Sequence, residues 1–171
     1  MILQTQRLTL RPFTMRDLRT THAYASDPDN TRYMLNLPNN KKRRTKQFLR
    51  CVVADWERKP QRRFEFAVTL GGKHIGAVSV TLEDNGRTGE LGWIIRKTHW
   101  GKGYATEAAA AVMQFARVRL GVTRCTARCD ARNAASARVM EKLGMVPAGE
   151  GVRVDMESGE TGKELVYAIE F

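Results

Sequence analysis

The stretch over residues 90–121 constrains the fold of this chain more than any other part of its sequence. Residues 90–95 form a mostly apolar run typical of a strand, and the loop Trp100-Gly101-Lys102-Gly103 follows it. Apolar side chains then recur with a helical period as far as Leu120, and Gly121 is the residue type expected at a helix end. A strand, a tight loop and a helix in this order predict an α/β structure.

The glycine loop is also the part of the sequence best suited to bind an anion. The N–H groups in the first turn of a helix have no intrahelical acceptor and carry partial positive charge. Glycine at 101 and 103 lets a phosphate approach the backbone, Lys102 adds a charge and Thr106 adds a hydroxyl donor. The loop matches neither a Walker A motif nor a dinucleotide-binding fingerprint, and a purely structural turn is the alternative. The predicted contacts to a pyrophosphate are Gly101, Lys102, Gly103, Tyr104, Ala105 and Thr106.

Strand and helix patterns follow one another along the rest of the chain, with turn residues between them. Gly71-Gly72 is a hairpin signal, and further turns are expected at residues 27–30, 84–86 and 157–160. The pattern predicts an α/β (α+β) fold with a mixed sheet of about seven strands and about four helices. The expected strands cover residues 7–13, 64–70, 75–82, 90–95, 122–130, 153–156 and 165–169, and the expected helices cover residues 14–26, 41–58, 104–120 and 133–143.

The length of 171 residues fits one compact domain, so we expect residues 1–171 to form a single domain. The sequence contains no apolar stretch of roughly 18 residues and no secretory signal pattern, which predicts no membrane helix.

Three cysteines form neither a disulfide framework nor a metal pattern, so we predict no metal and a reducing, cytoplasmic location. A monomer and a homodimer both fit.

The charge balance points to an anionic partner, because the formal net charge is +11. Basic residues are concentrated over residues 41–63, where only Asp55 and Glu57 oppose them. One interpretation is a solvated helix face. The other is a basic rim beside a substrate groove or close to the ribosome.

Four segments together resemble the GCN5-related N-acetyltransferase (GNAT) superfamily, and in particular its RimJ/RimL-like branch, which acetylates the N-termini of ribosomal proteins. They are an opening strand (residues 5–11), a later strand (89–95), a pyrophosphate loop (100–108) and a second cofactor motif (133–145). The resemblance spans nearly the whole chain and implies the GNAT fold, with a mostly antiparallel sheet. It departs from the superfamily signature at Thr98, where an Arg or Gln is usual.

The resemblance implies that the chain binds acetyl-CoA. The strand over residues 90–95 would splay from its neighbour and pair with pantetheine through Ile94, Ile95 and Arg96. Asn133 would bond pantetheine, and Ser136 would lie near the sulfur and act as the general acid. For Asn133 the alternative is a simple helix N-cap, and for Ser136 it is a backbone bond in the first turn.

The resemblance also suggests two carboxylates, Glu90 and Asp155, as candidates for the general base or for orienting the amine. For each of the two carboxylates, the alternative is a solvated strand residue or a member of a structural pair. Amine attack on a thioester needs no covalent enzyme intermediate, and the cysteines lie outside the motifs.

The predicted function is transfer of an acetyl group from acetyl-CoA to a primary amine. The acceptor is either a protein N-terminus, as in ribosomal-protein acetyltransferases, or a small amine such as an antibiotic, polyamine or amino acid. The alternative from another class is an acyl-CoA-binding protein without turnover. The sequence lacks the aromatic and helix-turn-helix patterns that would favour nucleic-acid recognition as the main role.

Overall fold

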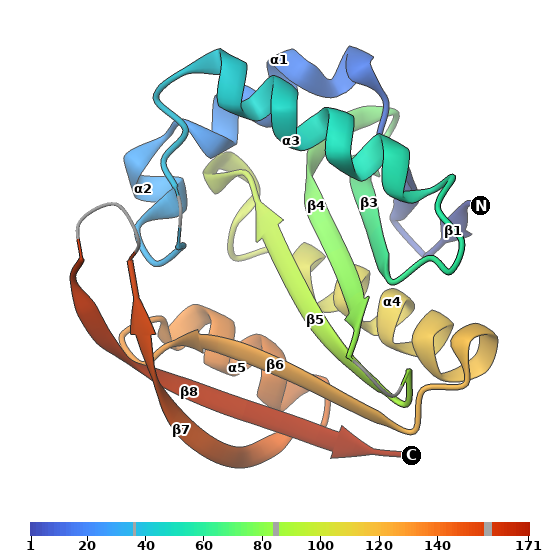
Figure 1. Ribbon diagram of the computed structural model, residues 1–171, viewed down its shortest axis with the longest axis vertical. Coiled ribbons are helices and arrows are strands. Elements are labelled where there is room, and N and C mark those ends of the chain that lie inside the picture. Colours follow the sequence, from blue (N-terminus) through green and yellow to red (C-terminus); the bar gives the residue numbers. More distant parts are fainter. Residues whose placement is uncertain (36, 84–85, 156–158) are drawn as a thin grey trace.

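The computed structural model describes residues 1–35, 37–83, 86–155 and 159–171, and in these residues one sheet runs from the first strand to the last (Figure 1). Its eight strands lie in the order β1-β2-β3-β4-β5-β6-β8-β7, and every neighbouring pair is antiparallel except β5 and β6. The strands are β1 (Leu3–Gln4), β2 (Leu8–Pro12), β3 (Arg63–Leu70), β4 (Lys73–Leu82), β5 (Thr88–Ile95), β6 (Arg124–Asp130), β7 (Val146–Val154) and β8 (Thr161–Glu170). The predicted mixed, mostly antiparallel sheet is confirmed.

Helices cover both faces of the sheet (Figure 1). The described residues form five α-helices: α1 (Leu18–Ala25), α2 (Pro28–Thr31), α3 (Lys42–Asp55), α4 (Tyr104–Leu120) and α5 (Ala134–Lys142). Short 3-10 turns precede α1, at Met15–Asp17, and α4, at Lys97–His99. The excess over about seven strands and four helices consists of β1, with two residues, and α2, with four.

Local sequence rules explain the β3–β4 hairpin. Gly71 and Gly72 have φ values of 53° and 77°, and two successive positive φ values suit a tight hairpin turn that only glycine adopts easily. The predicted turn is therefore confirmed. The next expected turn, over residues 84–86, lies mostly outside the described residues, because positions 84 and 85 are not described.

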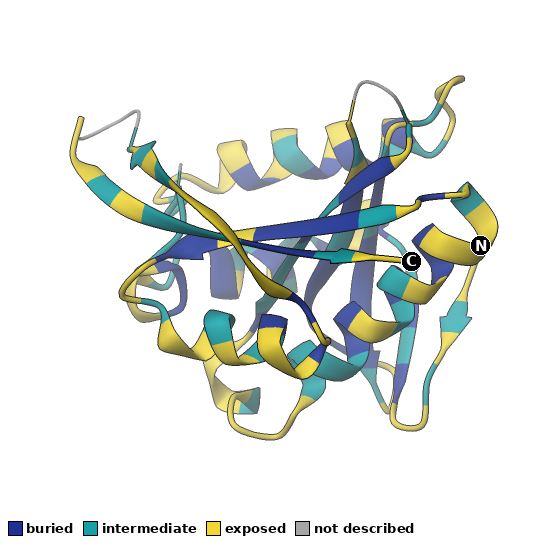
Figure 2. Cartoon of the chain, turned by 90° about the horizontal axis from the view of Figure 1, so that it is seen from below, coloured by how far each residue is buried: buried dark blue, intermediate teal, exposed yellow. Residues whose placement is uncertain are grey.

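Two apolar layers hold the helices on the sheet, and Figure 2 shows the buried residues concentrated between the layers. On one face, α4 buries Val112 and Phe115, and the Phe115 ring meets the rings of Phe64 and Phe66 edge-on. On the other face, α3 buries Leu49 and Val52 against strand residues of β3 and β4. Fully burying each such side chain stabilises the fold by about 1.5–3 kcal/mol.

Two expectations for the chain outside this core were wrong. Residues 27–30 were expected to form a turn, but they begin α2, because Asp27 accepts hydrogen bonds from the N–H groups of Asp29 and Asn30 while Pro28 occupies the first turn. The C-terminal strands are longer than predicted. β7 is largely exposed and rich in Gly and charged residues, so its sequence has no apolar alternation to mark it. Residues 156–158, which fall in the expected strand over residues 153–156 and the expected turn over residues 157–160, lie outside the described residues.

The strands β5 and β6 separate part of the way along. They pair in parallel only from Thr88 and Arg124 to Leu91 and Ala127. Beyond that point β5 continues along β4, whereas β6 continues along β8, and Figure 1 shows the two strands diverging. We call the space between residues 92–95 of β5 and 128–130 of β6 the β5–β6 gap.

No helix among the described residues is long and apolar enough to span a bilayer.

Candidate active site

The N-terminus of α4 is uncapped and open. Gly103 occupies the N-cap position with φ 80°, and no side chain caps the helix. The first intrahelical bond runs from the N–H of Glu107 to the carbonyl of Gly103 at 3.0 Å. The N–H groups of residues 104–106 therefore have no acceptor within the helix. Gly101, with φ 74°, has open space where a side chain would begin, so the predicted pyrophosphate loop has the shape of an anion cradle.

Arg7, which the sequence analysis did not single out, directly precedes β2 and holds this loop in place. Its guanidinium donates to the carbonyl of Lys102 at 3.0 Å and to Glu107 at 2.7 Å, and it lies 4.6 Å from the centre of the Tyr104 ring. Thr5 also donates to Glu107, at 2.6 Å. The only sequence signal was the position of Arg7 in the opening strand, because nothing local connects it with Glu107.

The positive charges around the loop are close enough to act on a neighbouring histidine. Burial, together with Lys102 and Arg96, holds the pKa of His99 below its usual value. Thr98, which replaces the usual Arg or Gln, shares a hydrogen bond of 2.9 Å with His99. An anion at this loop would meet the cationic side chain of Lys102 as well as the backbone N–H groups.

The register of β5 decides which of its backbone groups point into the gap. The carbonyl of Thr88 accepts from the N–H of Glu83, just after β4, and the N–H of Arg96 donates to the carbonyl of Ile75 in β4. Backbone groups alternate in direction along a strand, so the even-numbered residues between Thr88 and Arg96 face β4. The odd-numbered residues Trp93 and Ile95 consequently face the gap. Of the predicted trio, Ile94 thus directs its backbone groups to β4, and Arg96 directs its N–H there while its carbonyl accepts from the N–H of His99. Trp93, whose backbone groups face the gap, was not among the residues predicted from the sequence.

The end of β5 is tied to α2. The Ile95 carbonyl accepts hydrogen bonds from Asn30 at 3.3 Å and from the Trp100 indole at 2.5 Å. Asn30 also accepts from the N–H of Lys97 at 2.6 Å. These bonds leave the N–H of Ile95 and both backbone groups of Trp93 directed at the gap.

The start of α5 lies just beyond the end of β6, across the gap from β5. Asn133 caps α5, with its side-chain oxygen accepting from the N–H of Ser136 at 3.1 Å. Asn133 therefore caps α5, and its predicted bond to pantetheine stays a prediction. The Ser136 hydroxyl is half-buried and makes no hydrogen bond within the described part of the chain.

The two candidate carboxylates lie at different ends of the gap. Glu90 stands where β5 and β6 are still paired and accepts a hydrogen bond from Arg128 at 3.1 Å. Arg128 also approaches Glu164 on β8 at 3.6 Å. Asp155 follows β7 and lines a pocket at the other end. The structure therefore does not bring Glu90 and Asp155 together.

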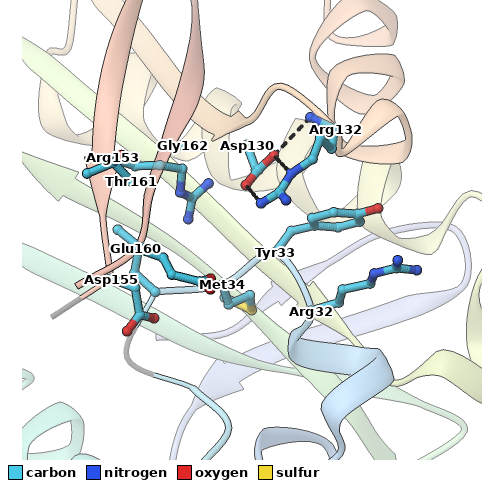
Figure 3. A pocket seen from close by; sticks show the side chains of 11 residues that line it. Arg32, Tyr33, Met34, Asp130, Arg132, Arg153, Asp155, Glu160, Thr161 and Gly162 are labelled. Atoms are coloured by element: carbon cyan, nitrogen blue, oxygen red, sulfur yellow. Dashed lines mark hydrogen bonds and ion pairs between the residues drawn. The ribbon is translucent and has the colours of Figure 1, made fainter. Parts of the chain in front are cut away.

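This pocket has a volume of about 410 Å³ and lies where the loop after α2, the end of β6 and the β7–β8 hairpin meet (Figure 3). Asp130 holds Arg132 by two hydrogen bonds of 2.9 and 2.8 Å, and these lower the pKa of the Asp130 carboxyl. The lining residues are Arg32, Tyr33, Met34, Leu35, Asp130, Arg132, Arg153, Asp155, Glu160, Thr161 and Gly162.

No group of three or more His, Cys, Asp or Glu side chains in the described ranges is placed to hold a metal ion.

Known proteins resemble this chain in both sequence and fold. YnaD, described as an uncharacterized N-acetyltransferase of Bacillus subtilis (strain 168), is 29% identical over 171 residues, covering 99% of this chain and 96% of its own length. The uncharacterized N-acetyltransferase p20 of Bacillus licheniformis is 29% identical over 150 residues, covering 86% and 83%. The crystal structure of a GNAT-family acetyltransferase from Bacillus anthracis superposes with a TM-score of 0.86 at 28% identity, covering 99% and 98%.

More distant solved structures share the fold alone. A RimL acetyltransferase of ribosomal protein L7/L12 superposes with a TM-score of 0.87 at 15% identity, covering 100% of this chain and 94% of that one. A spermidine N-acetyltransferase from Vibrio cholerae, solved with CoA and spermine, superposes with a TM-score of 0.82 at 20% identity, covering 97% and 96%. A sequence profile described as an acetyltransferase (GNAT) domain matches residues 7–146. The chain belongs to the GNAT family of acetyltransferases.

Proposed function

We propose that this acetyltransferase moves the acetyl group of acetyl-CoA to a primary amine by direct attack, without a covalent enzyme intermediate. The observation that carries the proposal is the uncapped N-terminus of α4, which follows, after a short loop, a strand that stops pairing with its parallel neighbour beyond Leu91. One feature suits a pyrophosphate and the other suits the amide groups of pantetheine. They follow each other in the order in which these groups occur in CoA.

The residues present fit this cosubstrate. The amides of residues 101–106 and the Lys102 ammonium would hold the pyrophosphate. Ile95 and Trp93 would pair with pantetheine along the open edge of β5, within the stretch expected from Ile94 to Arg96. Asn133, whose oxygen already caps α5, has its amide N–H groups left to donate.

Ser136 is the proposed general acid. In the reaction the acceptor nitrogen bonds to the acetyl carbon, the carbon–sulfur bond breaks, and the products are an amide and free CoA. The Ser136 hydroxyl would donate its proton to the departing sulfur and regain one from the proton that the amine releases through water. Its hydroxyl is available for this role because no protein group engages it within the described residues.

The thiols of the protein support direct attack. Burial raises the pKa of Cys125 to about 11 and raises that of Cys129 as well. A thiol held in its neutral form is a poor nucleophile. Cys51, the exposed cysteine, lies on α3.

Glu90 and Asp155 remain the candidates for receiving the amine proton. One oxygen of Glu90 is already engaged by Arg128, so Glu90 would act through its second oxygen or through water. Asp155 lies in the pocket at the open end of the gap, where it would orient the amine. The separation of the two residues means that they serve different roles, if both contribute.

For the acceptor, the proposal names only a class of molecule, a primary amine. The RimJ/RimL-like segments favour a protein N-terminus, and exposed basic residues on α3, including Arg43, Lys46 and Arg50, would suit work near the ribosome in the cytoplasm. The spermidine enzyme shares the fold, so the fold does not choose between a protein and a small amine. The proposal covers residues 1–171 as one catalytic domain, active as a monomer or a homodimer.

The deciding experiment measures free thiol released from acetyl-CoA, with and without peptide N-termini and small amines. Amine-dependent release that Ser136→Ala suppresses would support the proposal. Saturable acetyl-CoA binding without release for any amine would favour the acyl-CoA-binding alternative. Absence of acetyl-CoA binding would refute the proposal.

A further inference from the structure

The pocket between the end of α2 and the β7–β8 hairpin borders the β5–β6 gap at Asp130, the last residue of β6. One wall, Arg32 to Leu35, follows α2, which Asn30 ties to the end of β5. The opposite wall includes Asp130, the last residue of β6, and Arg132, which directly precedes the N-cap of α5. None of residues 101–106 lines this pocket. It is therefore separate from the proposed pyrophosphate cradle, and it shares Asp130, at the end of β6, with the edge of the β5–β6 gap.

Three arginines, Arg32, Arg132 and Arg153, are among the residues that line the pocket. Arg32 and Arg132 lie 5.6 and 5.9 Å from the centre of the Tyr33 ring, and Figure 3 shows Arg153 projecting between the walls. Arg132 is neutralised by its two bonds to Asp130. Arg32 and Arg153, in contrast, form no ion pair with a carboxylate in the described part of the chain, although Arg153 lies near enough to Asp130 to help lower the pKa of that carboxyl. Two guanidinium groups thus remain available for an oxyanion.

A glycine keeps the space around Arg153 open. A side chain added at Gly162, opposite Arg153 in the β7–β8 register, would begin 3.6 Å from Asp130, 3.7 Å from Arg153 and 3.9 Å from Arg132. Gly162 is not at a positive φ, so backbone strain does not explain glycine here. Its effect is to leave room where these three side chains converge.

The pocket also contains Asp155 and Glu160, which Figure 3 shows on the opposite side from Arg32. A pure polycation such as a polyamine would therefore meet two arginines that have no carboxylate partner. A molecule that carries an oxyanion besides its amine would instead bring a charge of opposite sign to these two arginines.

We infer that the acceptor of this enzyme carries, besides its amine, a carboxylate or phosphate group that Arg153 and Arg32 bind in this pocket. Guanidinium groups recognise both kinds of oxyanion through paired N–H donors. The inference rests on the proposed function for the identity of the ligand as an acceptor. Binding of the oxyanion itself can be measured without any turnover.

The test compares matched compounds that differ in the oxyanion. We would titrate trialanine against its C-terminal amide, and phosphoethanolamine against ethanolamine, by calorimetry in the presence of saturating CoA, with spermidine as the polycation. Charge-assisted bonds of this kind predict about tenfold tighter binding of the oxyanion member in at least one pair. Whether the carboxylate or the phosphate pair shows the larger ratio identifies the source of the oxyanion.

Two variants and one control make the test specific. Arg153→Met removes a guanidinium, and Gly162→Leu fills the space beside it, so both are expected to abolish the preference. Lys163→Met removes a neighbouring cation that pairs with Glu150 at 2.7 Å outside the pocket, and it should keep the preference. CoA binding and the unfolding midpoint of each variant show that the fold and the cosubstrate site are intact.

Equal affinity within both pairs, tighter binding of spermidine, or a preference that survives in Arg153→Met would overturn the inference. Failure of the proposed function would give a different result. The oxyanion preference in binding would persist, but acetyl-CoA would release no free thiol with any amine.

Discussion

Arg7 and Glu107 are 100 positions apart in the sequence, yet the Arg7 guanidinium donates from Nε to Oε2 of Glu107 at 2.7 Å. The backbone N–H of Arg7 donates to the other oxygen at 2.8 Å. Because Glu107 stands in the first turn of α4, these bonds connect the opening strand with the helix that carries the proposed pyrophosphate cradle. Burial alone would raise the pKa of Glu107, but the bonds from Thr5 and Arg7 hold that pKa below its usual value.

Glu107→Gln should weaken acetyl-CoA binding, because it removes the charge that holds Arg7 against the loop. Losing a charge-assisted hydrogen bond at a partly exposed site predicts a rise of about three- to tenfold in KM for acetyl-CoA and a loss of about 1–2 kcal/mol in unfolding free energy. Steady-state kinetics and urea unfolding measure the two effects. Arg119→Met, in the exposed last turn of α4, is the control, and equal effects in both variants would contradict this role of Glu107.

Gly103→Ala should raise KM for acetyl-CoA, whereas Gly121→Ala should not. The two glycines begin and end α4 with φ values of 80° and 71°, so a side chain strains the backbone at either position. Each substitution is expected to cost about 1–2 kcal/mol of stability, which thermal unfolding would detect. Only Gly103 lies at the anion cradle, with Arg7 at 3.4 Å from an added side chain. If both variants changed KM alike, the cradle would not be the cosubstrate site.

Ser136→Ala should lower kcat by about 10- to 100-fold while acetyl-CoA still binds, since general acid catalysis contributes to the transition state and not to binding. Rapid-quench measurement of acetyl transfer at saturating acetyl-CoA would report the chemical step. The alternative is that Ser136 only stabilises the first turn of α5. Asn133→Ala, which removes the cap of α5 and should cost about 1 kcal/mol of stability, is the reference for such a structural effect. A Ser136→Ala variant that lost stability to the same degree and kept its kcat would show that the serine is structural.

Glu65, on β3, should make the fold less stable as the pH rises towards neutrality. Burial raises the pKa of its carboxyl to about 7, against 4.5 for the group in isolation, while Arg63 and Ser79 partly favour the charged form. The folded chain therefore holds this proton more tightly than the unfolded chain. Its stabilising contribution is complete below about pH 4 and decreases between about pH 4.5 and pH 7.

Glu65→Gln removes this dependence. Urea unfolding at pH 5 and pH 8 should show a decrease in unfolding free energy that is larger in the wild type than in the variant by about 1–3 kcal/mol. Glu57→Gln, an exposed carboxylate near the end of α3, should behave like the wild type. Parallel pH profiles for the wild type and Glu65→Gln would show that Glu65 titrates as an ordinary surface group.

Local chemistry made part of the fold predictable. Gly71 and Gly72 specify a tight turn because few other residues adopt two positive φ values, and Asn133 specifies a helix start because its side chain accepts a backbone N–H. The same rules were too weak for two segments. α2 depends on the side chain of Asp27 bonding two residues within a four-residue helix, and β7 depends on pairing with β8. Neither segment has the apolar periodicity by which strands and helices are recognised.

The sequence by itself determined the strand-loop-helix unit around Gly101 and Gly103, the order of the main elements and the membership of the family. Each of these rests on neighbouring residues, whose conformational preferences and side-chain bonds act within a few positions. Only the tertiary structure decided that Trp93 and Ile95 face the gap, that Arg7 bonds to the loop at Lys102 and that Arg32 and Arg153 line one pocket. These relationships depend on which strands pair and in what register, and that is settled by burying one apolar core between elements distant in the chain.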